Sequence, residues 1–314
     1  MQVYDLVVIG GGISGISSAI AAKKNGVEGV LILEKDSELG GVMNLCVQNG
    51  FGMSQFNEDL TGPEFSQRFI DKAIALGIEN KLNTMALEIR KDKVITVVNS
   101  EDGIFEIKAK ATIFAAGCME NTKEAVNILG SKIAGIYTAG TAQRIVNTEG
   151  FLPGKQAVIV GSGDLGLVMA RTMIIEGAKV MAVIEPGAKP KGKDKYVTEY
   201  LDDFEIPLIL MHKVTELHGD ERVESVTVAE VDSEGRRIEG TEKTIECDTI
   251  LLAVDLMPDI ALLKNADIEV TSGITTDVNG VFVCGNANHI HENIDSIVEE
   301  SQNAGIMAAR FVEG

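Results

Sequence analysis

The sequence predicts an α/β protein in which two similar strand–helix–strand domains are combined, one inserted into the other. Three observations lead to this fold class. A glycine-rich motif occurs twice, a strand–turn–helix–strand pattern surrounds each copy, and the chain closes with a short strand and a helix that the second copy does not need. The first glycines of the two motifs, Gly10 and Gly161, are 151 residues apart.

Both copies of the motif follow a short apolar run and precede another one. The first copy, between the runs 6–9 and 30–33, is Gly10-Gly11-Gly12-Ile13-Ser14-Gly15. The second copy, between the runs 157–160 and 180–184, is Gly161-Ser162-Gly163-Asp164-Leu165-Gly166. An acid ends the later run in each case, Glu34 and Glu185, and lies 24 residues after the first glycine. Two such units, each with its acid, match the GxGxxG fingerprint of Rossmann-like domains and predict two dinucleotide sites. Two glycine-rich turns without a ligand are the alternative.

The chemistry of this fingerprint explains its residue types. The first glycine permits a tight turn, the second lets the backbone approach a pyrophosphate, and the third lets the helix pack closely on the strand. The phosphates then lie at the helix N-terminus, where unpaired N–H groups and the helix dipole favour negative charge. The acid accepts hydrogen bonds from ribose hydroxyls. Because Glu185 would repel a 2′-phosphate, it favours NAD(H) over NADP(H).

The amino-acid composition of the chain limits which binding partners it can have. A chain of 314 residues with 45% apolar residues can build two or three domains. Its formal charge of −19 makes nucleic acid and anionic membrane surfaces poor partners. The uncharged stretch 6–22 contains four glycines and three serines and follows no basic segment, so it indicates a buried strand and helix rather than a membrane or signal segment. We therefore expect no membrane insertion and a cytoplasmic location.

The cysteines and histidines do not form a recognisable metal or redox motif. The four cysteines are Cys46, Cys118, Cys247 and Cys284, and no two of them form a CxxC or another close pair. This spacing argues against a zinc ribbon, a cysteine-bound iron–sulfur cluster and a local redox disulfide. His289 and His291 alternate in a segment that we interpret as an ordinary polar loop, so no metal site is expected.

The spacing of apolar and turn residues in the rest of the chain predicts further helices and strands. Residues 61–64 open a helix whose apolar positions share one face. Residues 93–110 form a meander around a turn at 100–103, and 111–117 form a buried strand that ends in glycine. Later elements are expected at 223–246 (a hairpin), 249–254 (a buried strand), 281–286 (a short strand with a glycine turn) and 294–313 (a closing helix). The first domain then comprises 1–120 and 255–314, and the inserted domain 121–254.

Several of these segments resemble those of a known family of flavoproteins. The paired fingerprints, the strand end Ala115-Ala116-Gly117 and the run 281–286 are similar to those of the two-domain flavoproteins of the thioredoxin reductase and pyridine nucleotide-disulfide oxidoreductase class. The resemblance implies FAD in the first domain and NAD(P)H in the inserted domain, where Glu185 favours NAD. It implies FAD contacts at Gly10, Gly12, Ile13, Ser14, Gly15, Glu34, Lys35, Gly40, Gly41, Ala86, Ala115, Ala116, Gly117, Gly285, Asn286 and Ser296. It implies NAD contacts at Gly161, Gly163, Asp164, Leu165, Gly166 and Glu185.

A narrower resemblance concerns a subfamily. The segments 46–52, 60–64, 138–143 and 152–167 resemble those of the FAD/NAD-binding subunits that accompany anaerobic glycerol-3-phosphate dehydrogenase and related sarcosine, opine and proline dehydrogenases. This resemblance implies that the chain exchanges hydride between NAD(H) and FAD, and electrons with a partner dehydrogenase subunit. It does not decide whether the chain also forms a homo-oligomer.

Three features of the sequence depart from the class and leave alternative functions open. Asn286 replaces the usual Asp, Asp255 stands where the class has Gly near the nicotinamide, and the CxxC of thioredoxin reductases is missing. Cys46 is either a packing residue beside the flavin or a reactive thiol. The second reading predicts a free-standing NADH oxidase or disulfide reductase. A nicotinamide site obstructed by Asp255 predicts a non-catalytic flavin-binding scaffold.

A run of lysines follows Glu185 and bears on the choice of nucleotide. It consists of Lys189, Lys191, Lys193 and Lys195. These side chains either accept a 2′-phosphate, which would reverse the preference for NAD(H), or belong to an exposed loop.

Overall fold

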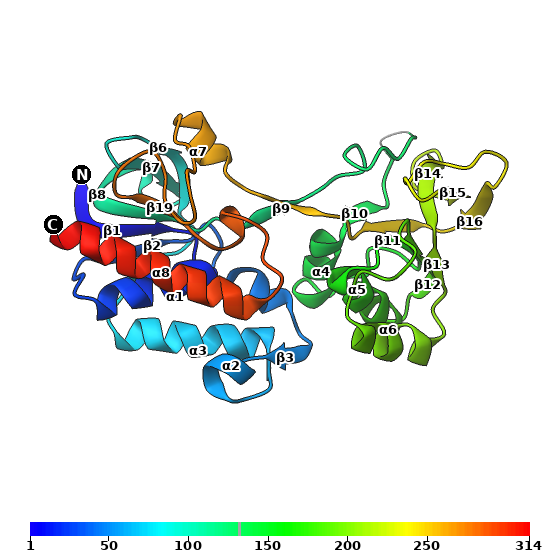
Figure 1. The fold of residues 1–314 in the computed structure, drawn as a ribbon, viewed down its shortest axis with the longest axis horizontal. Coiled ribbons are helices and arrows are strands. Elements are labelled where there is room, and N and C mark those ends of the chain that lie inside the picture. The colour runs from blue at the N-terminus through cyan, green and yellow to red at the C-terminus, as the bar shows by residue number, and fades with distance from the viewer. Residues whose placement is uncertain (131–132) are drawn as a thin grey trace. The chain divides into compact units, whose positions relative to one another are not determined.

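The computed structural model describes residues 1–130 and 133–314, which form two compact units (Figure 1). The first unit consists of Met1–Met119 and Met257–Gly314, and the second is Glu120–Leu256. The expected boundaries, after residues 120 and 254, differ from these by one and two residues. Both units are mixed α/β structures with parallel strands, as the sequence predicts.

The first unit is built on a seven-stranded sheet in the order β5-β2-β1-β8-β7-β6, with β19 also paired to β8. Its strands are β1 (Gln2–Ile9), β2 (Val30–Leu33), β5 (Glu79–Lys81), β6 (Met85–Ile89), β7 (Val94–Asn99), β8 (Gly103–Phe114) and β19 (Val281–Val283). The strands β5, β2, β1, β8 and β19 are parallel, whereas β7 runs antiparallel to both β8 and β6. The apolar side chains of β1 and β2 divide between two core clusters, one on each face of the sheet. This explains their continuous apolar sequence.

Helices cover one face of this sheet. They are α1 (Ile13–Lys24), α3 (Gly62–Ala75) and α8 (Ile294–Glu313), and α8 packs along α1 (Figure 1). Small residues permit the close approach of α1 and α8. A Cβ on Gly305 of α8 would collide with the backbone oxygen of Ser18 in α1. The remaining elements of the unit are η1 (Gly41–Leu45), β3 (Asn49–Phe51), α2 (Met53–Phe56), β4 (Leu60–Thr61), α7 (Ala261–Asn265) and η3 (Gly285–Ala287).

The second unit contains two sheets. The parallel sheet has the order β10-β17-β11-β12-β13, and the antiparallel sheet has the order β14-β15-β16. Its strands are β10 (Ile136–Thr138), β11 (Gln156–Val160), β12 (Lys179–Glu185), β13 (Leu208–Leu210), β14 (His212–His218), β15 (Ser225–Glu230), β16 (Lys243–Glu246) and β17 (Thr249–Leu252). Its helices are α4 (Ala139–Asn147), α5 (Asp164–Ile175), α6 (Asp194–Tyr200) and η2 (Asp202–Phe204). The chain passes between the units in β9 (Cys118–Glu120) and β18 (Leu256–Pro258), which pair with each other.

Most expected elements are present, with one difference in the first unit. The second strand of the meander and the buried strand that ends in glycine are one strand, β8. The first half of β8 pairs with β7 and its last residues pair with β19, so one strand serves both parts of the sheet. The helix predicted from residue 61 is α3, which begins with a capping box between Thr61 and Glu64. In the described residues, no helix is both long and apolar enough to cross a membrane.

Candidate functional site

The loop between β1 and α1 has the geometry of a phosphate cradle. Gly10 has a φ of 109°, and a Cβ there would collide with the backbone oxygen of Ala115. A Cβ on Gly15 would collide with the backbone oxygen of Gly10, so the helix needs glycine to pack this closely. A Cβ on Gly12, in contrast, would meet only the Cα of Gly41, at 3.9 Å. The first and third glycines are therefore required by the fold, whereas the second faces space that a ligand can occupy.

Glu34, which follows β2, stabilises this loop by hydrogen bonds. Its Oε2 accepts a hydrogen bond from the backbone N–H of Gly11 at 2.7 Å. Its Oε1 accepts one from the backbone N–H of Asp36 at 2.8 Å. The residue is buried, yet a carboxylate can accept about four hydrogen bonds, so lone pairs remain for a ribose hydroxyl. The predicted acid therefore orders the protein loop in addition to its expected role toward a ligand.

The loop between β11 and α5 repeats the same construction. Gly161 has a φ of 104°, and a Cβ there would collide with the backbone oxygen of Ala253. A Cβ on Gly166 would collide with the backbone oxygen of Gly161. A Cβ on Gly163 would meet nothing within 4 Å. Asp164 and Leu165 follow as the first residues of α5. The two fingerprints thus match in which glycines are packed and which one is open.

Glu185 stabilises the second loop by hydrogen bonds, as Glu34 stabilises the first. Its Oε2 accepts hydrogen bonds from the backbone N–H and the Oγ of Ser162, at 3.1 and 2.7 Å. Its Oε1 accepts one from the backbone N–H of Gly187 at 2.8 Å. The residue is fully buried, and these three donors leave about one of its lone pairs for a further partner.

The lysine-rich loop that follows Glu185 is held against this second fingerprint. The backbone N–H of Lys191 donates to Ser162 Oγ at 3.0 Å, and that of Gly192 donates to the backbone oxygen of Ser162 at 2.8 Å. The backbone N–H of Lys193 donates to Asp164 Oδ1 at 2.9 Å. Sequence reasoning missed this arrangement. The only signal for it is the pair of polar side chains, Ser162 and Asp164, at the variable positions of the motif.

The side chains of the same loop stay exposed and reach two carboxylates. Lys193 Nζ lies 3.3 Å from Asp164 Oδ2, and Lys191 Nζ lies 4.0 Å from Asp255 Oδ1. The Asp255 side chain is 87% exposed. Exposed ion pairs of this kind contribute little to stability. Their effect is to place two ammonium groups close to the second fingerprint.

The end of the chain brings the last predicted turn onto the first fingerprint. A Cβ on Gly285 would collide with Ser14 Oγ, so the turn after β19 packs against the start of α1. The side chain of Asn286 is used within the unit. Its Oδ1 accepts a hydrogen bond from the backbone N–H of His291 at 3.1 Å, and its Nδ2 lies 3.9 Å from Cys118 Sγ. The structure therefore brings Ser14 and Gly285 together.

The other predicted FAD residues come from several segments around this loop. Gly40 donates its backbone N–H to the backbone oxygen of Gly11 at 2.8 Å, and Gly41 follows it against Gly12. Ala115 contacts Gly10, and Ala116 and Gly117 continue from the same strand end. Lys35 is exposed directly after Glu34. Ser296 lies in the first turn of α8 and precedes Ile297, whose side chain is 3.6 Å from the Cβ position of Gly285. Ala86 lies in β6, two residues after Thr84, whose backbone N–H donates to the backbone oxygen of Glu34 at 2.8 Å.

Cys46 follows η1, whose first residue, Gly41, lies against Gly12 of the first fingerprint. Burial raises the pKa of its thiol to about 11, so the neutral thiol dominates near pH 7. Its Sγ donates to the backbone oxygen of Val42 at 3.5 Å. Burial likewise raises the pKa of Cys247 and of Cys284 to about 12. No disulfide joins the cysteines of the described residues.

The two units define a protein with two dinucleotide-binding loops. In each loop, the second glycine faces open space and a glutamate is hydrogen-bonded to the loop. The sequence profile of the pyridine nucleotide-disulphide oxidoreductase family matches residues 4–308. The chain belongs to this family. It is an oxidoreductase with FAD and NAD(P)H as cofactors, and the open positions at Gly12 and Gly163 fit two dinucleotides.

Individual relatives are more distant. The chain is 25% identical to a subunit of opine oxidase from Rhizobium meliloti over 190 residues, which cover 60% of this chain and 40% of that protein. It is 24% identical to HcnB, a hydrogen cyanide synthase subunit from Pseudomonas protegens, over 285 residues, which cover 84% of this chain and 59% of that protein. The chain thus spans about half the length of these two relatives.

The fold is also similar to that of a solved enzyme. The crystal structure of T. acidophilum thioredoxin reductase superposes with a TM-score of 0.74 at 24% identity. The match covers 99% of this chain and 98% of that one. At this identity the likeness shows the two-domain fold, not the substrate.

Proposed function

We propose that this chain transfers hydride between NAD(H) and FAD and exchanges electrons with a partner dehydrogenase subunit. The observation that carries the proposal is the duplicated loop. One copy lies in each unit, and each has its second glycine open and its acid hydrogen-bonded to the loop backbone. FAD supplies the hydride acceptor and the electron carrier. The protein then has to bind and orient two dinucleotides.

The residues of the first unit are proposed to hold FAD. The N–H groups at the start of α1 bind the pyrophosphate, and Glu34 orders the loop and accepts the ribose hydroxyls. The contact between Ser14 and Gly285 is the observation that supports a contribution from the last turn, because it joins that turn to the phosphate loop.

The residues of the second unit are proposed to hold NAD(H). The N–H groups at the start of α5 bind its pyrophosphate, and the remaining lone pair of Glu185 accepts a ribose hydroxyl. A 2′-phosphate would bring negative charge to this buried carboxylate, which favours NADH over NADPH. Lys191 and Lys193 oppose this preference, because their ammonium groups lie near the same loop.

The role of a partner subunit is supported by the names of two relatives. The opine oxidase relative and HcnB are both subunits of larger enzymes by name. The absence of a CxxC from the sequence supports the same idea, since electrons then need an acceptor outside the chain. A partner of the amino-acid or glycerol-3-phosphate dehydrogenase type is the substrate-oxidising component that this proposal requires.

A disulfide reductase that uses Cys46 is the second candidate. Its support is the fold shared with a thioredoxin reductase over nearly the whole chain. The raised pKa of the Cys46 thiol counts against it, because the thiolate is the reactive form.

One assay separates the candidates. The purified chain is mixed with NADH and an artificial dye, with and without a small disulfide, and compared with the Cys46→Ser variant. Dye reduction that persists in Cys46→Ser supports electron transfer through the flavin alone. Disulfide-dependent turnover that is lost in Cys46→Ser supports the reductase. A flavin that NADH does not bleach supports the scaffold alternative, and Asp255→Gly then tests whether the exposed carboxylate obstructs the nicotinamide.

The partner requires a second experiment. The complex isolated gently from its own cells should reduce NAD⁺ when supplied with a glycerol phosphate, an opine or an amino acid, whereas the isolated chain should not. Substrate-dependent NAD⁺ reduction by the isolated chain would reject the partner role while leaving the NADH–FAD reaction intact.

A further inference from the structure

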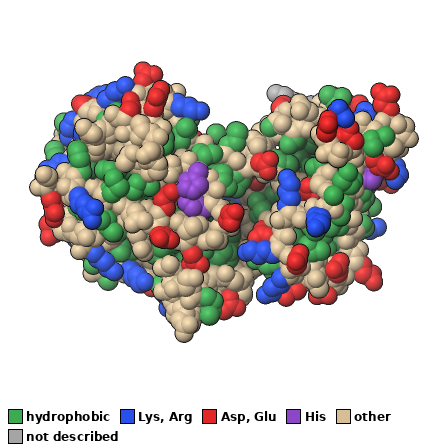
Figure 2. All heavy atoms as spheres, viewed as in Figure 1, with side chains coloured by type: hydrophobic (Ala, Val, Ile, Leu, Met, Phe, Trp, Pro, Cys, Tyr) green, Lys and Arg blue, Asp and Glu red, His purple; other side chains and the backbone are tan. Residues whose placement is uncertain are grey.

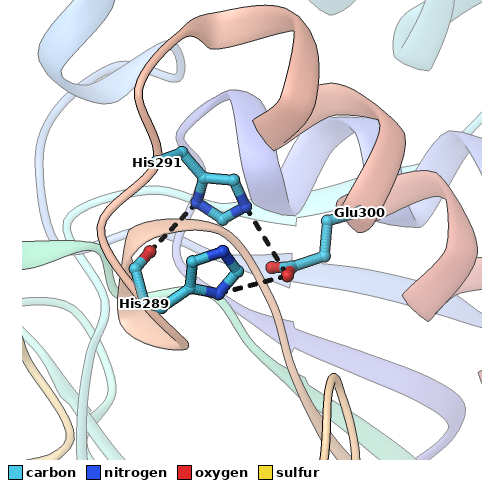
Figure 3. Close-up of side chains that lie close together, drawn as sticks. All are labelled: His289, His291 and Glu300. Atoms are coloured by element: carbon cyan, nitrogen blue, oxygen red, sulfur yellow. Dashed lines mark hydrogen bonds and ion pairs between the residues drawn. The ribbon is translucent and has the colours of Figure 1, made fainter.

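Three potential metal ligands converge beside the last turn of the first unit. They are His289, His291 and Glu300, and their ligand atoms all lie within 4.8 Å of one another (Figure 3). Both histidines come from the segment after η3, and Glu300 comes from α8. Figure 2 shows a patch of histidine side chains with acidic side chains beside it on the surface of this unit. Sequence reasoning treated the histidines as an ordinary loop because Glu300 belongs to a separate helix.

Two distances within the cluster match those around a four-coordinate cation. His289 Nδ1 lies 3.4 Å from Glu300 Oε2, and His291 Nε2 lies 3.5 Å from the same oxygen. Ligand atoms that are bonded to a tetrahedral zinc ion at about 2.0–2.2 Å are separated by about 3.3–3.6 Å. Each histidine therefore lies at a ligand-to-ligand distance from Glu300 that suits such an ion.

The hydrogen bonds of His291 indicate which of its nitrogens is available to a cation. Its Nδ1 lies 3.0 Å from the backbone oxygen of His289 and 3.3 Å from Asn286 Oδ1, both of which are acceptors. Nδ1 therefore carries a hydrogen, and Nε2 is the nitrogen that can bind a cation. The side chain is only 5% exposed, and its Nε2 lies beside the Glu300 carboxylate.

The outer contacts follow the pattern that surrounds metal ligands. A metal-bound histidine usually donates its other N–H to a carbonyl or a carboxylate, and a ligating carboxylate is itself hydrogen-bonded. His291 Nδ1 has the first kind of contact. Glu300 has the second, because its Oε1 accepts the backbone N–H of Gly285 at 2.8 Å and its Oε2 accepts Asn288 Nδ2 at 3.1 Å.

Space for a further ligand is also present. A shallow surface pocket of about 440 Å³ is lined by all three residues, together with Gly273, Ile274 and Ser296 among others. Water can reach a bound ion from this side. The cluster offers imidazole nitrogens and only one carboxylate, which suits zinc and related d-block ions better than magnesium or calcium, whose preferred ligands are all oxygens.

We propose that His289, His291 and Glu300 form a binding site for one divalent d-block cation of the zinc class, with water completing its coordination. Because Glu300 also holds the N–H of Gly285, the ion ties the turn after β19 to α8. It therefore stabilises the segment that packs on the first fingerprint at Ser14.

The test is metal binding by the intact, chelator-treated and desalted protein. Zn²⁺ is titrated by calorimetry, and Co²⁺ is titrated by the visible spectrum of four-coordinate cobalt. His289→Ala is the main variant, because this side chain is 58% exposed and its loss leaves no buried cavity. Glu300→Gln is the second variant. His218→Gln and Glu313→Gln remove a histidine and an acid outside the cluster and serve as matched controls.

We expect one ion per chain in the wild type and in both controls, with a higher unfolding temperature when metal is bound. Affinity should fall by at least about tenfold in His289→Ala and in Glu300→Gln. The absence of saturable one-to-one binding would overturn the proposal and leave a shared proton between Glu300 and the histidines. Binding that both variants retain, or a cobalt spectrum with thiolate charge-transfer bands, would overturn it as well.

Discussion

Ser162 Oγ donates a hydrogen bond to Glu185 Oε2 at 2.7 Å, across the loop that joins β11 to α5. The corresponding contact in the first unit runs from the backbone N–H of Gly11 to Glu34 Oε2, also at 2.7 Å. In each unit, the residue after the first glycine of the fingerprint is thus bound to the acid at the end of the next strand. The acids fix the conformation of the two phosphate loops before any nucleotide arrives.

Ser162→Ala tests the importance of this contact for nucleotide binding. The variant removes one charge-assisted hydrogen bond to Glu185 and the acceptor of the Lys191 N–H. A hydrogen bond to a charged group contributes about 1.5–3 kcal/mol, so the KM for NADH should rise about tenfold or more while the flavin content stays unchanged. Steady-state dye reduction measures this, with Ser233→Ala in an exposed turn as the control. An unchanged KM would show that the loop is ordered without the hydroxyl.

NADH should be preferred over NADPH by about tenfold or more, because the buried Glu185 carboxylate repels a 2′-phosphate. The ratio of kcat/KM for the two nucleotides measures the preference. Lys191→Ala and Lys193→Ala should change the NADH value little. Equal values for both nucleotides in the wild type, with a loss of NADPH activity in the lysine variants, would reverse the assignment and make the loop a phosphate site.

Cys46 should react slowly with alkylating reagents at neutral pH. Burial raises its pKa to about 11, so the thiolate is about one part in ten thousand at pH 7. Because the pKa is raised, reactivity should increase about tenfold per pH unit from pH 7 up to that pKa. Iodoacetamide labelling followed by peptide mass spectrometry gives the rate at this residue. Fast labelling at pH 7 would restore Cys46 as a candidate nucleophile.

Anaerobic titration with NADH should reduce the protein by two electrons per chain, which is the capacity of the flavin alone. No CxxC is present in the sequence, and the thiols of Cys46, Cys247 and Cys284 are free. Absorbance changes during the titration give the electron count. Uptake of four electrons, with a long-wavelength thiolate–flavin band halfway, would reveal a redox disulfide and return the chain to the disulfide reductases.

Local patterns explain the parts of the fold that the sequence could predict. The fingerprints and the capping box of α3 both depend on residues near one another in the chain. The length of β8 could not be predicted in this way. A glycine-ended buried strand and a meander strand look separate in sequence, and only their shared pairing with β1 shows that they are continuous.

Contacts between distant segments explain what the sequence could not predict at the site. The return of the lysine loop onto Ser162 and Asp164 depends on how the chain folds back after β12. The convergence of His289 and His291 on Glu300 depends on the packing of α8 beside the last turn. Ala86 was included among the FAD residues by resemblance, and only the folded chain brings its segment to Glu34, whose backbone oxygen accepts the N–H of Thr84.

The most direct test of the two-site account is a comparison of Gly12→Ala with Gly163→Ala. Both positions are open in the structure, so both variants should fold, and Gly15→Ala serves as the control for a glycine that the fold itself requires. We measure the bound flavin per chain and the dissociation constant for NADH. We expect Gly12→Ala to lose flavin, whereas Gly163→Ala should keep its flavin and bind NADH at least about tenfold more weakly. Loss of flavin from Gly163→Ala together with full flavin in Gly12→Ala would contradict the assignment of the two sites.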